Sequence, residues 1–189
     1  MPVVQGYAII SREGMIAHAD GSFPDVLKRP GDHQFFRAGV RAADAIIHGR
    51  NSGEKDAVTA NRPRLILTRE IASLAHDPAN PYALRWNPHG APFADAWQHL
   101  GVAAGNNVAA VLGGTDVFEL FLQVGYDTFF LSCADVSLSA GRKVFAGPET
   151  PQARLRAHGL TLRSCRQLDA APRVILETWH RANGRAPDT

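Results

Sequence analysis

The sequence has little cysteine and almost no net charge. Cys133 and Cys165 are its two cysteines among 189 residues, and the formal net charge is +2. Cysteine-based metal sites need clustered spacing such as C-x-x-C, which two isolated cysteines do not provide, so we expect no metal. We interpret both cysteines as buried thiols, with a single disulfide as the alternative. A charge this small gives no reason to expect nucleic acid or a membrane surface as a partner.

Long apolar runs are also missing. No stretch is long enough to span a bilayer. The first residues, MPVVQGYAIISREG, lack the basic region and long apolar segment of a signal peptide. With 45% hydrophobic and 20% charged residues, we expect a globular cytoplasmic protein, a monomer or homodimer. The length favours a single domain over residues 1–189.

Several motifs that are diagnostic of a particular reaction class are absent. The sequence has no H-E-x-x-H zinc motif, no G-x-S-x-G nucleophile elbow and no G-x-x-x-x-G-K-[ST] phosphate loop. These absences argue against zinc peptidases, hydrolases with a serine elbow and P-loop nucleotidases.

What the sequence does contain is an alternation of strand and helix patterns. Strands are predicted at residues 3–10, 44–49, 64–68, 106–114 and 126–134, and helices at 32–43, 93–100 and 115–125. This order predicts an α/β fold with a central, mostly parallel sheet flanked by helices. Residues 73–92 are interpreted as mostly irregular. The tail, 153–168 and 171–182, is predicted to form an antiparallel pair at one edge of the sheet.

Three predicted strands end in residues suited to phosphate groups. They are followed by Gly-Arg-Asn-Ser at 49–52, by Thr-Arg at 68–69 and by Gly-Gly-Thr-Asp at 113–116. Ligands of parallel α/β sheets bind at the carboxyl ends of strands, and a helix that follows glycines offers backbone N–H groups to an anion. Any one segment is equally a plain turn. Together they indicate one dinucleotide site.

The order of these motifs resembles the dihydrofolate reductase superfamily. The resembling series is GR-x-[ST], LILT, V-x-GG-x-x-V-[FY]-x-x-FL and D-x-x-x-L-[ST], and it extends from about Val4 to Phe145. Two branches of the superfamily match. Dihydrofolate reductase itself is similar in the acidic residue that begins the first helix, here Asp32. The riboflavin-pathway pyrimidine reductase is similar in the stretches SREGMIA, R-x-x-ADAII and GRKVFAG.

The resemblance implies hydride transfer from NADPH, with NADH as the alternative, to a pterin or pyrimidine. It makes Asp32 the catalytic acid, although Asp32 could instead cap the helix. Substrate contacts are implied for Ile9, Ile10, Phe36 and Ser132. Cofactor contacts are implied for Ala17, Gly49, Arg50, Asn51, Ser52, Thr68, Arg69, Gly113, Gly114, Thr115, Asp116 and Val117. A cis peptide is implied between Gly113 and Gly114.

The sequence departs from the family at two positions. Asp116 stands where an arginine usually binds the cofactor 2′-phosphate, and Phe23 is the nearest counterpart of the usual loop tryptophan. Our leading hypothesis is reduction of dihydrofolate to tetrahydrofolate. The alternatives are 5-amino-6-(5-phosphoribosylamino)uracil reductase of riboflavin biosynthesis and a nucleotide-binding module without catalysis.

Overall fold

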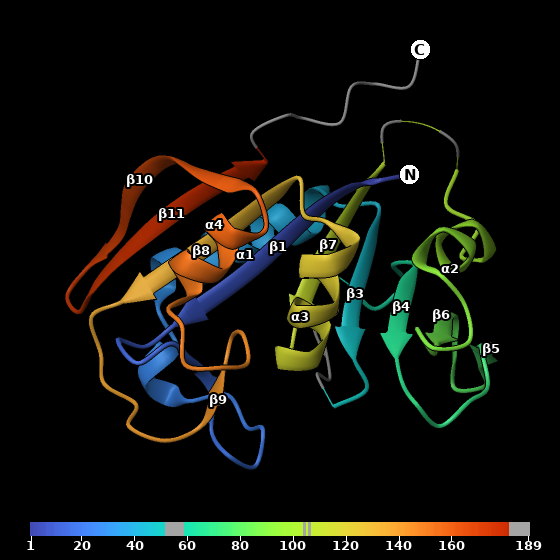
Figure 1. Cartoon of the computed structure of the whole chain (residues 1–189), viewed down its shortest axis with the longest axis horizontal. Coiled ribbons are helices and arrows are strands. Elements are labelled where there is room, and N and C mark those ends of the chain that lie inside the picture. The colour runs from blue at the N-terminus through green and yellow to red at the C-terminus, as the bar shows by residue number, and fades with distance from the viewer. Residues whose placement is uncertain (52–58, 104, 106, 182–189) are drawn as a thin grey trace.

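A nine-stranded sheet runs through the whole molecule. The computed structural model describes residues 1–51, 59–103, 105 and 107–181. The strand order is β10-β11-β8-β1-β7-β3-β4-β6-β5 (Figure 1). The bounds are β1 Val3–Ile10, β3 Ala45–Gly49, β4 Arg64–Leu67, β5 Leu74–Asp77, β6 Asn80–Trp86, β7 Val108–Gly113, β8 Thr128–Ala134, β10 Leu160–Ala170 and β11 Arg173–Arg181. A second, two-stranded sheet pairs β2 (Met15–Ala17) with β9 (Arg142–Lys143).

The centre of the large sheet is parallel and both of its edges are antiparallel. The pairs β8–β1, β1–β7, β7–β3, β3–β4 and β4–β6 are parallel. The β10–β11 pair joins β8 antiparallel at one edge, and β5 joins β6 antiparallel at the other. The predicted fold class, with its antiparallel C-terminal edge, is confirmed.

Helices cover both faces of the sheet because its buried strands are apolar on both sides. α1 (Pro30–Ala42) lies on one face, whereas α2 (Phe93–His99), α3 (Thr115–Val124) and α4 (Pro151–Ala157) lie on the other (Figure 1). Neighbouring residues of a strand point to opposite faces. Thus Ile46 packs toward α1 and Ile47 packs toward α3.

Two predictions of secondary structure are wrong. Residues 73–92, interpreted as irregular, contain the β5–β6 hairpin, in which Asp77 and Asn80 face each other across the turn. The beginning of the tail, predicted as strand, is instead the helix α4. Its N-cap is Thr150, whose side chain accepts a hydrogen bond from the Ala153 N–H, and Pro151 occupies the first helical position, where proline is favoured.

One helix start also differs from expectation. α1 begins at Pro30 with Arg29 as its N-cap, so Asp32 lies inside the first turn and is not the cap. α3 begins at Thr115, as predicted, with Gly114 as its N-cap, and the Thr115 hydroxyl donates a hydrogen bond to the Lys143 carbonyl. The capping interpretation of Asp32 is therefore wrong, and its side chain is available for another role.

Candidate functional site

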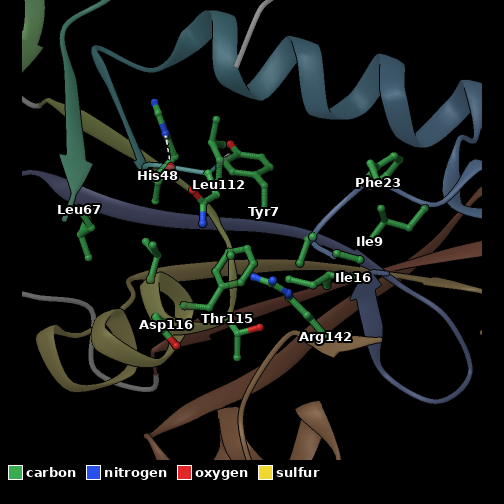
Figure 2. Close-up of a pocket in the computed structure, with 18 of the residues that line it drawn as sticks. Tyr7, Ile9, Ile16, Phe23, His48, Leu67, Leu112, Thr115, Asp116 and Arg142 are labelled. Carbon is green, nitrogen blue, oxygen red and sulfur yellow. Dashed lines mark hydrogen bonds between the residues drawn. The ribbon is translucent and has the colours of Figure 1, made fainter. Parts of the chain in front are cut away.

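One large cavity lies at the carboxyl ends of the parallel strands. Its volume is about 1700 Å³. The ends of β1, β3, β4, β7 and β8 and the starts of α1 and α3 form its walls. In Figure 2, Thr115 and Asp116 lie at the start of α3, while Arg142 reaches in from β9. This is the edge of the sheet where parallel α/β folds bind ligands.

The structure brings most of the predicted site residues together around this cavity. Those that line it are Ile9, Ala17, Asp32, Phe36, Gly49, Arg50, Asn51, Thr68, Arg69, Gly114, Thr115, Asp116, Val117 and Ser132. Their roles remain predictions. Ser52 lies outside the described residues. Ile10 points to the other face of the sheet from Ile9 and packs in the core on the face that carries α2, α3 and α4.

A half-buried carboxyl group occupies the α1 side of the cavity. Asp32 accepts a hydrogen bond from the Ser132 hydroxyl on β8, which lowers its pKa. Burial, the largest effect, and the nearby Asp169 carboxylate raise it, and His33 lowers it. The net result is a raised pKa, because burial disfavours the charged form of a carboxyl group. A carboxyl of this kind holds its proton to higher pH than an exposed aspartate.

Aromatic rings form the wall beside Asp32. The ring centroids of Tyr7 and Phe130 are 4.9 Å apart, and those of Phe35 and Phe130 are 5.3 Å apart. Phe36 meets Tyr7 edge-on at 6.3 Å. The Tyr7 hydroxyl donates to Gln5 Oε1 at 2.7 Å, and burial raises the pKa of this phenol to about 12. The wall is therefore uncharged at neutral pH and suits a flat heterocycle.

The opposite side of the cavity carries two exposed pairs of charges. Arg50, after β3, is paired with Glu70, and Arg69, after β4, lies 3.5 Å from the Asp116 carboxylate. Exposed ion pairs are worth about 0–1 kcal/mol, so an incoming anion can compete for either arginine. The two carboxylates oppose such an anion at the same time.

Two glycines shape the corner between these charges and α3. The Gly113–Gly114 peptide is cis, as the resemblance implies. Gly113 has a φ of +89°, and a Cβ there would lie 2.4 Å from the Phe118 ring, so its place is in the core behind the cavity lining. A Cβ on Gly114 would meet no atom within 4 Å among the described residues. Gly114 therefore leaves open space at the start of α3, where backbone N–H groups lack helical partners.

Comparison with known proteins connects this architecture to solved structures. A protein from Shewanella sp. PV-4 that is assigned to riboflavin biosynthesis matches with a TM-score of 0.63 and 15% identity, over 96% of this chain and 99% of that one. Dihydrofolate reductase from Enterococcus faecalis, complexed with NADP(H) and the ligand RAB-propyl, matches with a TM-score of 0.66 and 15% identity, over 96% and 97% of the two chains. The chain has the dihydrofolate reductase-like fold. No family model and no curated protein matches the sequence.

Within this dihydrofolate reductase-like fold, sequence reasoning missed several residues at the site. Tyr7 and Phe130 lie on strands whose apolar pattern indicates only burial, and nothing in it marks a cavity wall. Arg142 belongs to the GRKVFAG stretch that carries part of the resemblance, and that was its available signal. Asp169 contacts the first turn of α1 from a distant strand, and no local motif announces it.

The described residues hold neither a cluster of metal-binding side chains nor a membrane-spanning helix. Across residues 1–51, 59–103, 105 and 107–181, no group of three or more His, Cys, Asp or Glu side chains is placed to hold a metal ion. In the same parts of the chain, no helix combines the length and the apolar character needed to cross a membrane.

Proposed function

We propose that this protein is a reductase that uses a nicotinamide dinucleotide to reduce a pterin-type substrate, with dihydrofolate as the leading candidate. The observation that carries the proposal is the Asp32 carboxyl, with its raised pKa, in a cavity whose far side has arginines and a helix start. The side of the cavity with Asp32 and the side with the arginines suit two different ligands. Both solved neighbours are consistent with this class of chemistry, although at 15% identity they establish the fold alone.

The dinucleotide would lie along the ends of β3, β4 and β7. Open space at Gly114 and the first turn of α3 suit a pyrophosphate, and Arg50 and Arg69 suit a further phosphate group. NADPH is the cofactor we propose, with NADH as its competitor because Asp116 and Glu70 face the same arginines. When bound, the cofactor supplies a hydride.

The residues of the chain would orient the substrate and manage its protonation. The substrate heterocycle would lie against Phe36 and Tyr7, with Asp32 and Ser132 within reach of its ring nitrogens. Reduction of a C=N bond places the hydride on carbon and requires a proton on nitrogen. Asp32, which remains protonated at higher pH than an ordinary aspartate, would hold or relay that proton.

A pyrimidine that carries a ribose phosphate is the second candidate substrate. Lys28 and Arg29 line the cavity just before α1 and would face the phosphate. Each already has a partner, since Lys28 Nζ lies 2.6 Å from Asp25 Oδ1 and Arg29 Nη2 donates to the Val26 carbonyl at 2.8 Å. These contacts are exposed, like the pairs of Arg50 and Arg69, so a phosphate can compete for Lys28 and Arg29, and the pyrimidine remains the second candidate.

The test is oxidation of NADPH and of NADH by the purified protein, followed by loss of the absorbance of the reduced nicotinamide. Each cofactor is offered with dihydrofolate and, separately, with the phosphoribosyl pyrimidine. We expect turnover with dihydrofolate and NADPH. Turnover with the pyrimidine but not with dihydrofolate would make the pyrimidine the assigned substrate. Binding of a dinucleotide without its oxidation in any combination would favour a binding module and refute the reductase.

A further inference from the structure

The C-terminal strand β10 makes a specific contact with the start of α1. The Asp169 carboxylate accepts two backbone hydrogen bonds from the first turn of that helix, from Gly31 N at 2.9 Å and from Asp32 N at 3.1 Å. These N–H groups have no partner inside a helix, so a carboxylate at this place stabilises the helix start. The contact joins residues that are 138 and 137 positions apart.

Three further features allow β10 to lie close to the first turns of α1. The pairing of β10 with β11 shifts between Gln167 and Asp169, and such a bulge redirects side chains. A Cβ on Gly31 would lie 2.3 Å from the Leu168 carbonyl oxygen, so only glycine permits this approach. One turn further along α1, the Arg166 guanidinium lies 5.6 Å from the centre of the Phe35 ring.

We propose that Asp169 is a positioning residue for Asp32: it holds the first turn of α1 against β10 and keeps the Asp32 carboxyl beside Ser132 at the cavity wall. The inference rests on the proposed function in one respect, because it takes Asp32 to be the group that meets the substrate. Nothing in the resemblance marks Asp169, and the role follows from the two hydrogen bonds, the bulge and Gly31.

Asp169 is also an electrostatic neighbour of Asp32. Asp32 faces the Ser132 hydroxyl from β8, the Asp169 carboxylate from β10 and the His33 ring on α1 itself. The cations just before α1 are directed elsewhere, Lys28 toward Asp25 and Arg29 toward the Val26 carbonyl. Arg166 on β10 is directed toward Phe35. Among the described residues, Asp169 is therefore the negative charge that favours a proton on Asp32.

The experiment compares the pH profile of kcat/KM in wild type, Asp169→Asn and Asp169→Glu. Protonated Asp32 is the active form, so the rate falls as the pH rises through its pKa. Asp169→Asn removes the repelling charge and keeps one acceptor oxygen, so the pKa of Asp32 should be lower than in wild type. The fall in kcat/KM should then occur at lower pH, and above that pH the variant should be several-fold slower than wild type. Asp169→Glu keeps the charge and should restore the wild-type profile.

The matched control is Asp44→Asn. Asp44 also accepts a backbone hydrogen bond across the fold, from Val108 N at 2.8 Å, but at the amino ends of β3 and β7, away from the cavity. It should leave the profile unchanged. A loss of rate in Asp169→Asn that is equal at every pH would assign Asp169 a purely structural role and overturn the proposal.

A second measurement separates this proposal from the reductase assignment. Carbon-13 NMR of labelled aspartate carboxyls, with the Asp32 signal assigned by its loss in Asp32→Asn, follows the titration of Asp32 without any substrate. Asp32 should titrate at lower pH in Asp169→Asn than in wild type. An inactive wild type refutes the reductase, whereas an unshifted titration refutes the role of Asp169. If Asp169→Asn does not fold, Gly31→Ala disrupts the same contact and should shift the titration in the same direction.

Discussion

At the scale of single residues, the proposed chemistry depends on one carboxyl group placed in a partly dry environment. Asp32 is half-buried beside aromatic rings, with the Ser132 hydroxyl as its hydrogen-bond donor. A group in this position can hold a proton at a pH where an exposed aspartate has lost it. Its place on the first turn of a helix fixes it more rigidly than a loop would.

Replacement of Asp32 by asparagine should therefore abolish most of the turnover. Asparagine keeps the shape and can still hydrogen bond to Ser132, but it has no proton to exchange. We expect kcat to fall by about 10²–10⁴-fold, the usual contribution of general acid catalysis, with an unchanged melting temperature. In wild type the rate should fall as the pH rises through the raised pKa of Asp32, and this dependence should disappear in the variant. Unchanged turnover in Asp32→Asn would refute the assignment.

If the protein is the reductase we propose, we predict that Asp116 limits how well the site binds a cofactor with a 2′-phosphate. Asp116→Asn removes a negative charge and releases Arg69 from its pair. If the phosphate lies there, the ratio of kcat/KM for NADPH to that for NADH should rise up to about fivefold, the value of one exposed ion pair. Asp135→Asn is the matched control, because Asp135 pairs with Arg12 outside the cavity lining. An equal ratio in wild type and both variants would remove Asp116 from the cofactor site.

At the scale of elements, the secondary structure is predicted correctly where burial determines the pattern of apolar residues, and incorrectly where it does not. The central strands are apolar runs because both of their faces are covered, and such runs are recognisable in a sequence. The sequence predicts a strand within α4 because Ala153, Leu155 and Ala157 alternate with arginines, although only Leu155 of these three is fully buried. The helix start is instead indicated by Thr150-Pro151, an N-cap residue followed by proline. The contact of Asp169 with α1 depends on tertiary structure, so no local pattern reveals it.

Two loops are joined by a single glutamate. Glu13 follows β1, and its carboxylate accepts hydrogen bonds from the Ser11 hydroxyl, from the Ser137 hydroxyl at 2.7 Å and from Leu138 N at 2.8 Å. The Leu138 bond is the largest of the effects that lower the pKa of Glu13 from an ordinary 4.5 to about 2. The segment after β8 is thereby attached to the turn that leads into β2.

Glu13 should therefore make stability depend on pH in acid. A group whose pKa is lowered in the folded state stabilises it above the unfolded pKa, and this contribution is lost as the pH falls from 4.5 toward about 2. We expect Glu13→Gln to melt below wild type at pH 7, with the difference shrinking across that range. Glu149→Gln, which changes another exposed glutamate, should leave the melting curve unchanged. A difference that is constant with pH would contradict the prediction.

At the scale of the whole molecule, the two halves of the chain are interleaved in one sheet. β1 lies between β7 and β8, and β7 lies between β1 and β3. Neither the N-terminal nor the C-terminal half can complete its own set of strands. We therefore propose that residues 1–189 fold as one domain.

That proposal predicts a single unfolding transition. Trp86 on β6 and Trp179 on β11 are buried on opposite sides of the sheet centre and report on both edges. Denaturation followed by tryptophan fluorescence and by far-UV circular dichroism should give coincident curves. Two separated transitions would show that the edges unfold independently.

The size of the cavity predicts that cofactor and substrate bind together. A site for one drug-sized ligand usually has a volume of about 300–1,000 Å³, whereas this cavity has about 1700 Å³. Its charged side and its aromatic side are separate, so a dinucleotide on the first leaves room on the second. A saturating ligand at 100 times its Kd stabilises the folded protein by about 2.7 kcal/mol. Thermal melting with NADPH, with a non-reducible pterin analogue and with both should therefore give shifts that add. A combined shift in melting temperature that is no greater than the larger single shift would mean that the two ligands compete for the same site.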